Sequence, residues 1–192
     1  MKPRIALYGG AFDPPQLAHE TIAREAIKQL NLDKLYIVPS GPRSDKVYKA
    51  SQEYREKIME IFTENINSPK VELSKDFLDG KIKNTTLNTD KLFRQKLGFS
   101  PYQIFGSDVI DNMWERDPAG EVALRLPKII VKRPGFEVDT SKIDNFILLE
   151  PFKNSEVADL SSTLIRENIK KRVFDGLNGV LANFIDQNKL YI

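Results

Sequence analysis

Short apolar segments alternate with amphipathic segments along most of this chain. The apolar segments have the length of buried strands, and the longer segments between them carry apolar residues at helical spacing. The predicted strands are Arg4–Tyr8, Lys34–Pro39, Val71–Leu73, Tyr102–Gly106, Lys128–Lys132 and Asn145–Leu149. The predicted helical faces are formed by Leu17, Ile22, Ala26, Ile27 and Leu30; by Ile58, Ile61 and Phe62; and by Leu87, Leu92, Phe93 and Leu97.

The order of these segments predicts the fold class. Strands that alternate with helices form mainly parallel sheets, so we expect an α/β, Rossmann-like, doubly wound sheet with helices on both faces. Residues 161–192 indicate a C-terminal helical pair, separated near Gly176 and Gly179. No repeat, low-complexity tract or linker interrupts the pattern, so residues 1–192 are expected to form a single domain. Ligands of such sheets bind beyond the carboxyl ends of the strands.

Composition narrows the chemistry and the setting. The 29 Lys and Arg residues nearly balance 27 Asp and Glu residues, which does not indicate nucleic-acid binding. The absence of cysteine and the presence of one histidine exclude a thiolate nucleophile, a Cys-based zinc site and a His-rich metal site. The start of the chain resembles a strand rather than a signal peptide, and no apolar run could span a bilayer. We expect a cytoplasmic protein without membrane contact, and its oligomeric state, a homo-oligomer included, stays open.

The loop after the first predicted strand is a candidate phosphate site. Glycines at a strand-to-helix turn let the backbone approach a bulky ligand, and a helix N-terminus attracts anions. Gly9 and Gly10 occupy such a turn, and His19, the only histidine, lies in the first turn of the predicted helix. The glycine pair alone is as typical of an ordinary turn beside a surface histidine.

A second candidate anion site lies near the end of the chain. Ser161 or Ser162 can cap the helix that follows, and Arg166 adds a guanidinium suited to phosphate oxygens. Alone, this segment is equally typical of a capped helix with a solvated arginine. Two such segments in one chain are stronger evidence than either.

Both segments resemble signatures of the nucleotidylyltransferase superfamily. Residues 9–19 read G-G-A-F-D-P-P-Q-L-A-H and resemble G-G-S-F-D-P-x-H-x-G-H, with Gln16 in place of the first histidine. Residues 159–166 resemble the second signature, I-S-S-T-x-I-R. The resemblance implies transfer of a nucleoside monophosphate from a triphosphate onto a phosphorylated acceptor.

Further segments resemble the nicotinate mononucleotide adenylyltransferase family. They are Leu35–Lys46 with its P-P-H-K loop, Tyr54–Met59 with its R-x-x-M helix, Asn84–Thr89 with its S-Y-T-x-x-T segment, Ile104–Asp108 with its I-x-G-x-D strand end, Ile129–Gly135 with its V-x-x-R-P-G, and Phe184–Tyr191 with its closing Y-I-x-x-x-x-L-Y. Asp45 stands where the P-P-H-K loop has histidine, so this chain departs from the family at positions 16 and 45.

The resemblance implies a role for each candidate residue. His19 and Gln16 are the expected catalytic pair at the α-phosphate. The expected ATP-binding residues are Gly9, Gly10, Ala11, Phe12, Gly106, Asp108, Arg133, Ser161, Ser162 and Arg166, and the expected acceptor-binding residues are Lys46, Thr86 and Trp114. Mg²⁺ is expected with ATP, held by phosphate oxygens and water rather than by protein ligands.

The resemblance implies adenylyl transfer from ATP to nicotinate mononucleotide, which gives deamido-NAD and pyrophosphate. Two alternatives stay open: a sister nucleotidylyltransferase with another phosphorylated acceptor, and a homologue that binds nucleotides as a sensor or regulator without catalysis. The preference between nicotinate and nicotinamide mononucleotide is also open.

Overall fold

A single parallel sheet forms the centre of the molecule. The computed structural model describes residues 2–42, 47–110, 120–133, 135, 137, 139–152 and 157–192. The strands are β1 (Ile5–Gly10), β2 (Lys34–Pro39), β3 (Val71–Leu73), β4 (Tyr102–Gly106), β5 (Lys128–Val131) and β6 (Phe146–Leu149). They form one six-stranded sheet in the order β3-β2-β1-β4-β5-β6, and every pairing is parallel. The order reverses between β1 and β4, where α/β sheets place their ligands.

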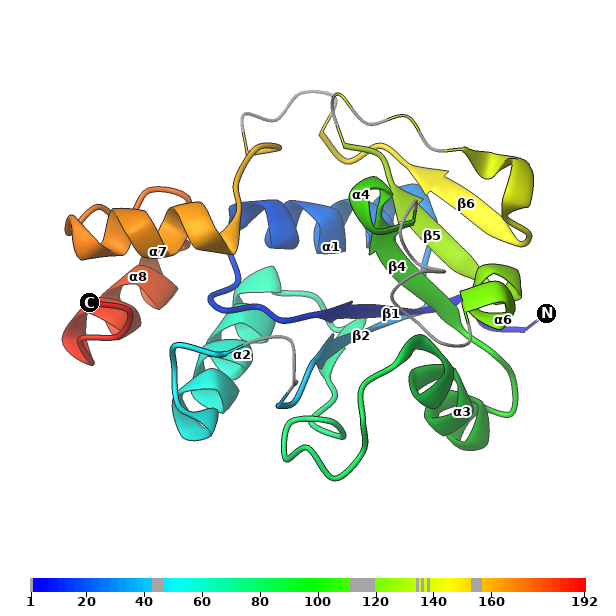
Figure 1. The fold of residues 1–192 in the computed structure, drawn as a ribbon, viewed down its shortest axis with the longest axis horizontal. Coiled ribbons are helices and arrows are strands. Elements are labelled where there is room, and N and C mark those ends of the chain that lie inside the picture. Colours follow the sequence, from blue (N-terminus) through cyan, green and yellow to red (C-terminus); the bar gives the residue numbers. More distant parts are fainter. Residues whose placement is uncertain are drawn as a thin grey trace.

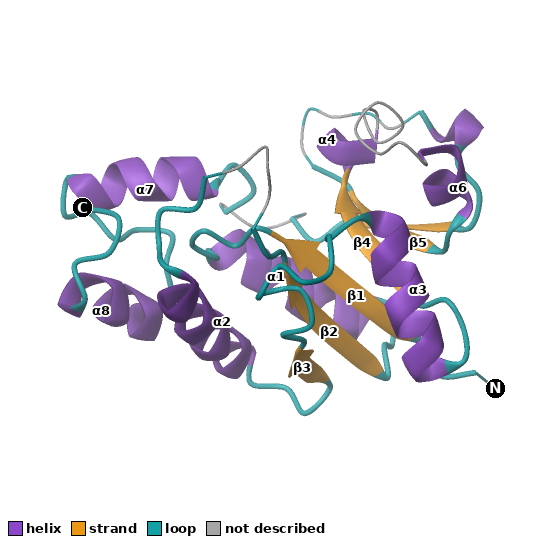
Figure 2. Cartoon of the chain, turned by 60° about the horizontal axis from the view of Figure 1, so that its bottom comes forward, coloured by secondary structure: helices purple, strands orange, loops and turns teal. Residues whose placement is uncertain are grey.

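Helices cover both faces of this sheet, because side chains of successive strand residues point to opposite faces. Ala6 and Tyr8 belong to one apolar cluster with α1 (Leu17–Gln29) and α2 (Gln52–Ile66). Leu7 lies in a different cluster with Phe93 of α3 (Thr86–Leu97). Figure 2 shows α3 in front of the sheet and α1 behind it. The predicted Rossmann-like fold is therefore confirmed.

The C-terminal helices pack at one end of the molecule (Figure 1). They are α7 (Ser162–Lys170) and α8 (Gly179–Gln187). Their buried residues, among them Ile165, Leu181 and Ile185, form a cluster with Ile58 of α2. The remaining short helices are α4 (Ser107–Ile110), α6 (Gly120–Arg125) and the 3-10 turn η1 (Thr140–Lys142).

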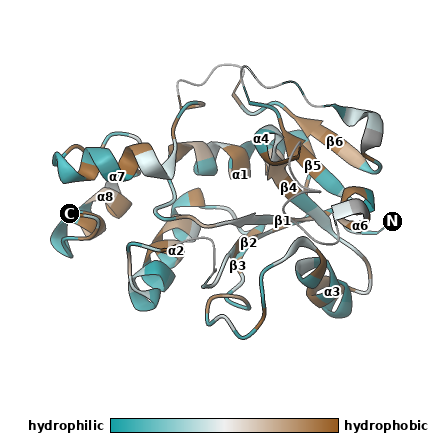
Figure 3. Ribbon diagram, in the orientation of Figure 1, coloured by the Kyte–Doolittle hydropathy of each residue, from teal (hydrophilic) through white to brown (hydrophobic). Residues whose placement is uncertain are grey.

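The predicted strands agree with the structure except at some ends. β1 begins one residue later than predicted and continues through Gly9 and Gly10, which pair with Val38 and Pro39 of β2. β6 begins at Phe146 rather than Asn145, because Asn145 has a φ of 51° and cannot continue a strand. β5 ends at Val131 rather than Lys132. Figure 3 shows hydrophobic residues along β4 to β6 and mixed helix surfaces, as the apolar pattern predicts.

Candidate active site

The loop between β1 and α1 is packed against the first turn of α1. The Phe12 side chain is 2% exposed, with its ring centroid 5.0 Å from that of His19. A Cβ atom at Gly10 would lie 2.9 Å from the Phe12 ring, so a glycine is needed for the ring to fold back. The structure thus brings the candidate residues Gly10, Phe12 and His19 together at the carboxyl end of β1.

The backbone fixes the orientation of the His19 ring. The Gln16 backbone N–H donates to His19 Nδ1 at 3.1 Å, as part of the capping box of α1. Since Nδ1 accepts a hydrogen bond, a neutral imidazole carries its proton on Nε2. His19 is the third residue of α1, where the positive end of the helix dipole lies. His19 Nε2–H is therefore a donor at a helix N-terminus.

The Gln16 side chain has a structural role of its own. It is 2% exposed and forms the N-cap of α1 by accepting a hydrogen bond from the Ala18 backbone N–H. Its Nε2 donates to the Leu160 carbonyl oxygen at 2.9 Å. Gln16 thus connects α1 to the segment that precedes α7, and its contact with a phosphate stays a prediction.

The second signature lies directly against the first. Ser161 is the N-cap of α7, as the sequence predicts, with its Oγ accepting a hydrogen bond from Leu164 N at 3.2 Å. Ser162 Oγ donates to the Pro14 carbonyl oxygen at 2.8 Å, and Arg166 Nη1 donates to the Asp13 carbonyl oxygen at 2.6 Å. Residues about 150 positions apart in the sequence therefore meet at one place.

Asp108 and Arg133 form a third part of the site, at the carboxyl ends of β4 and β5. Arg133 Nε lies 3.6 Å from Asp108 Oδ1, and Arg133 N donates to Ser107 Oγ at 3.2 Å. Both Asp108 Oδ1 and Arg133 Nε are buried without a hydrogen bond to any part of the chain that the structure describes. Buried polar atoms normally have partners, so this pair is suited to a polar ligand.

Tyr8 lies on β1 next to these groups. Burial raises its pKa well above the usual range, and Asp108 raises it further while Arg133 lowers it. Its ring centroid is 6.1 Å from that of His19. Tyr8 therefore stays neutral and forms an apolar wall between the histidine and the charged pair.

The acceptor side is described only in part. Thr86 is the first residue of α3, behind the N-cap Thr85, and Gln103 of β4 donates from Nε2 to the Thr86 carbonyl oxygen at 3.0 Å. This bond places the N-terminus of α3 beside the sheet. Lys46, Asp45 and Trp114 lie outside the described residues, so their expected positions stay predictions.

Three buried polar residues beneath the loop were missed by the sequence reasoning. Asp13, Arg55 and Tyr191 are 0%, 3% and 8% exposed, and the Tyr191 hydroxyl donates to Asp13 Oδ1 at 2.9 Å. Each lies inside a segment that resembles the family, and that is the signal that could have found them. A polar residue in a sequence gives no sign of whether it is buried.

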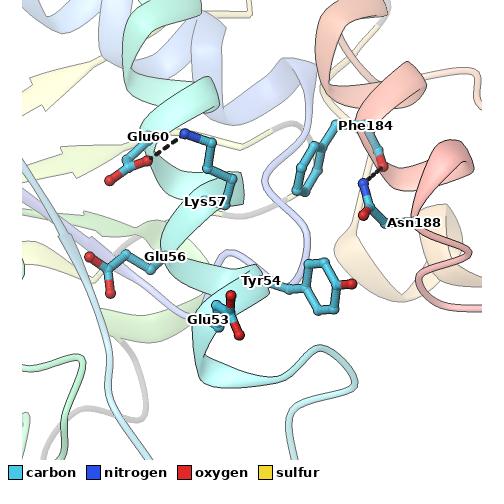
Figure 4. A pocket seen from close by; sticks show the side chains of 7 residues that line it. All are labelled: Glu53, Tyr54, Glu56, Lys57, Glu60, Phe184 and Asn188. Carbon is cyan, nitrogen blue, oxygen red and sulfur yellow. Dashed lines mark hydrogen bonds and ion pairs between the residues drawn. The ribbon is translucent and has the colours of Figure 1, made fainter.

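A surface pocket between α2 and α8 is a poor candidate for the nucleotide (Figure 4). Tyr54 and Phe184 line it, together with one lysine, one asparagine and the three glutamates Glu53, Glu56 and Glu60. An excess of carboxylates repels a triphosphate. The loops at the strand ends remain the better site.

Comparisons with known proteins agree with this site. The cytidylyltransferase-like family model matches residues 7–168. A probable nicotinate-nucleotide adenylyltransferase of Clostridium tetani is 30% identical, with 86% of each chain covered. The nicotinate-nucleotide adenylyltransferase of Bacillus subtilis is 28% identical, with 98% of each chain covered.

Solved structures show the same fold. The nicotinic acid mononucleotide adenylyltransferase of Plasmodium falciparum, complexed with NaAD, aligns with a TM-score of 0.81 and 24% identity over 98% of this chain and 97% of that chain. No helix within the described ranges is long and apolar enough to cross a membrane. The family model, the Clostridium tetani relative and the meeting of the two signatures show that this chain belongs to the cytidylyltransferase-like family and, within it, to the nicotinate-nucleotide adenylyltransferases.

Proposed function

We propose that this chain transfers the AMP moiety of ATP to nicotinate mononucleotide, with deamido-NAD and pyrophosphate as products. The observation that carries the proposal is the convergence of the two signatures: Ser162 and Arg166 of α7 bond to the loop in front of His19. The names of the relatives supply the acceptor and the place in NAD biosynthesis.

The reaction is an in-line displacement at phosphorus. An oxygen of the acceptor 5′-phosphate attacks the α-phosphorus, the bond from that phosphorus to the bridging oxygen breaks, and pyrophosphate leaves. No enzyme nucleophile is required, so catalysis consists of positioning and charge stabilisation. His19 Nε2–H would donate to an α-phosphate oxygen as charge builds there.

The remaining ATP contacts follow the strand ends. The backbone of Gly9 to Phe12 would lie along the nucleotide, and the unpartnered Asp108 Oδ1 would accept a hydrogen bond from a ribose hydroxyl. Arg166 bonds to the Asp13 carbonyl oxygen and to Thr163 Oγ1. A guanidinium has five N–H donors, so donors remain for the β- and γ-phosphates, next to the N-terminus of α7.

Mg²⁺ belongs to this proposal as a companion of ATP. Within the ranges that the structure describes, no group of three or more His, Cys, Asp or Glu residues is placed to hold a metal ion. Mg²⁺ commonly keeps several waters and binds substrate phosphates, which fits a site built from N–H donors. The ion would neutralise charge on the departing pyrophosphate.

The acceptor and the setting complete the proposal. The N-terminus of α3 at Thr86, with Lys46 and Trp114, would hold the mononucleotide. One sheet with α7 and α8 packed against α2 supports a single domain over residues 1–192. Cytoplasmic location, as the sequence predicts, is part of the same proposal.

The test is pyrophosphate release from ATP and Mg²⁺ with nicotinate mononucleotide, nicotinamide mononucleotide or 4′-phosphopantetheine. We expect the highest kcat/KM with nicotinate mononucleotide and deamido-NAD as the adenylylated product. Release only with phosphopantetheine would contradict the proposal and support a sister transferase.

The position of Gln16 favours one alternative, a nucleotide-binding homologue without catalysis. The family signature has histidine here, whereas the Gln16 amide is buried and bonded to Leu160. Calorimetry separates the two functions: ATP binding without pyrophosphate release, whatever the acceptor, would identify the sensor.

A further inference from the structure

A buried polar network lies beneath the phosphate loop, and the proposed chemistry does not use it. Its centre is Asp13, which is 0% exposed. Asp13 Oδ1 accepts a hydrogen bond from the Tyr191 hydroxyl at 2.9 Å, and Oδ2 accepts one from the Lys49 backbone N–H at 3.2 Å. The Asp13 carbonyl oxygen accepts the bond from Arg166. One residue therefore joins the loop after β1, the segment after β2, α7 and the segment after α8.

Arg55 of α2 forms the second half of the network. Its Nη2 donates to the Ser40 carbonyl oxygen at 2.6 Å and to the Ala11 carbonyl oxygen at 3.3 Å. Its guanidinium carbon lies 3.5 Å from the centre of the Tyr48 ring, and the Tyr48 hydroxyl lies 2.7 Å from Ser40 Oγ. Arg55 thus holds the loop after β1 and the segment after β2 together from below.

Charge explains why the network keeps one geometry. Asp13 and Arg55 are both almost fully buried, and a buried charge is tolerated only when it is paired and hydrogen-bonded. Burial lowers the pKa of Arg55, while the nearby Asp13 raises it. Each charge therefore depends on the other and on its hydrogen bonds, so movement of either loop would leave a charge without partners.

Function gives this geometry a purpose. The loop after β1 carries the proposed nucleotide contacts, and the segment after β2 resembles the acceptor loop of the family. In-line transfer requires the two substrates to meet in a defined geometry, and a misplacement of about 1 Å can lower the rate about 100-fold. A rigid connection between the two segments would set this geometry.

We infer that Tyr191 and Arg55 are positioning residues for adenylyl transfer, which act through Asp13 to hold the nucleotide loop (residues 9–16) and the acceptor segment (residues 40–49) in one fixed relation. The inference rests on the proposed function and adds residues that touch neither substrate. Tyr191 is the more informative of the two, because removal of its hydroxyl leaves its ring in the apolar cluster of α7 and α8.

The test is Tyr191→Phe. Loss of one hydrogen bond to a buried carboxylate should let the two segments move relative to each other. We expect kcat to fall about tenfold, while the Kd for ATP alone changes less than about twofold, because the nucleotide contacts remain. Hydrogen exchange of backbone amides should become faster in residues 9–16 and 40–49.

Two variants serve as controls. Tyr54→Phe removes a hydroxyl from a tyrosine that packs against the same cluster, where its ring contacts Phe184. Leu181→Ala lowers stability through a cavity in α8, far along the chain from either loop. Both should keep kcat within about twofold of the unmodified protein at a temperature where each is folded. A kcat of Tyr191→Phe within twofold of the unmodified protein would overturn the inference, and so would a loss no larger than that of Leu181→Ala.

Failure of the proposed function is recognised separately. If the unmodified protein makes no deamido-NAD, the proposed function is wrong, and hydrogen exchange decides the inference. Faster exchange in both segments of Tyr191→Phe, but not of Tyr54→Phe, would support the fixed relation. Unchanged protection in either segment would overturn it.

Discussion

Gly106 is the position where one added methyl group should remove a substrate contact. A Cβ atom at Gly106 would lie 2.3 Å from Asp108 Oδ1, whereas ordinary contacts begin near 3.4 Å. In Gly106→Ala the Asp108 carboxylate must therefore move by about 1 Å or more. Asp108 is 39% exposed in its side chain, so it can rotate toward solvent at a cost of about 0.5–1.5 kcal/mol.

The expected result is a loss of ATP recognition without a comparable loss of stability. The ion pair of Asp108 with Arg133 and the proposed bond to a ribose hydroxyl are both lost when the carboxylate moves. A hydrogen bond to a charged group contributes about 1.5–3 kcal/mol, so the KM for ATP should rise about 10- to 100-fold. Steady-state kinetics with varied ATP measure the KM, and urea unfolding measures the stability, which should change by less than about 1.5 kcal/mol.

Gly179→Ala is the matched control, because nothing lies within 4 Å of a Cβ atom at Gly179. It should leave the KM for ATP unchanged. In an Asp108→Ala background, Gly106→Ala should have no further effect, since the methyl group acts through the carboxylate. An unchanged KM in Gly106→Ala would refute the placement of Asp108 at the ribose.

Three further results are expected. His19→Ala should lower kcat about 100- to 1,000-fold with little change in the Kd for ATP, because Nε2–H acts on charge that develops during transfer; near-normal turnover in steady-state kinetics would contradict this role. Gln16→His should raise kcat about tenfold at saturating substrates if position 16 reaches the phosphate, and an unchanged kcat would leave it as a helix cap. Burial lowers the pKa of Lys128 to about 8, so the folded protein loses this proton at a lower pH than the unfolded chain. The free energy of unfolding should therefore rise by about 1–2 kcal/mol from pH 8 to pH 10, and Lys128→Met should lack this rise in urea unfolding.

Local pattern was sufficient for the elements of this fold. Strands such as β2 and β4 agree with their predicted bounds because a short apolar run between polar segments fits only a buried strand. The same holds for the first turn of α1 at His19 and for the N-cap Ser161, since capping depends on residues only a few positions apart. The boundary at Asn145 was missed because a positive φ depends on the packing of the turn around it.

Only the tertiary structure decided how these elements form a site. The order β3-β2-β1-β4-β5-β6 and the bonds from Ser162 and Arg166 to the loop after β1 depend on the path of the whole chain. The same is true of Gln16, whose amide bonds to Leu160, 144 positions away, and of Asp13 and Tyr191, 178 positions apart. Hydrogen bonds and burial of this kind follow from which segments the sheet brings together, and no periodicity or spacing within a segment encodes them.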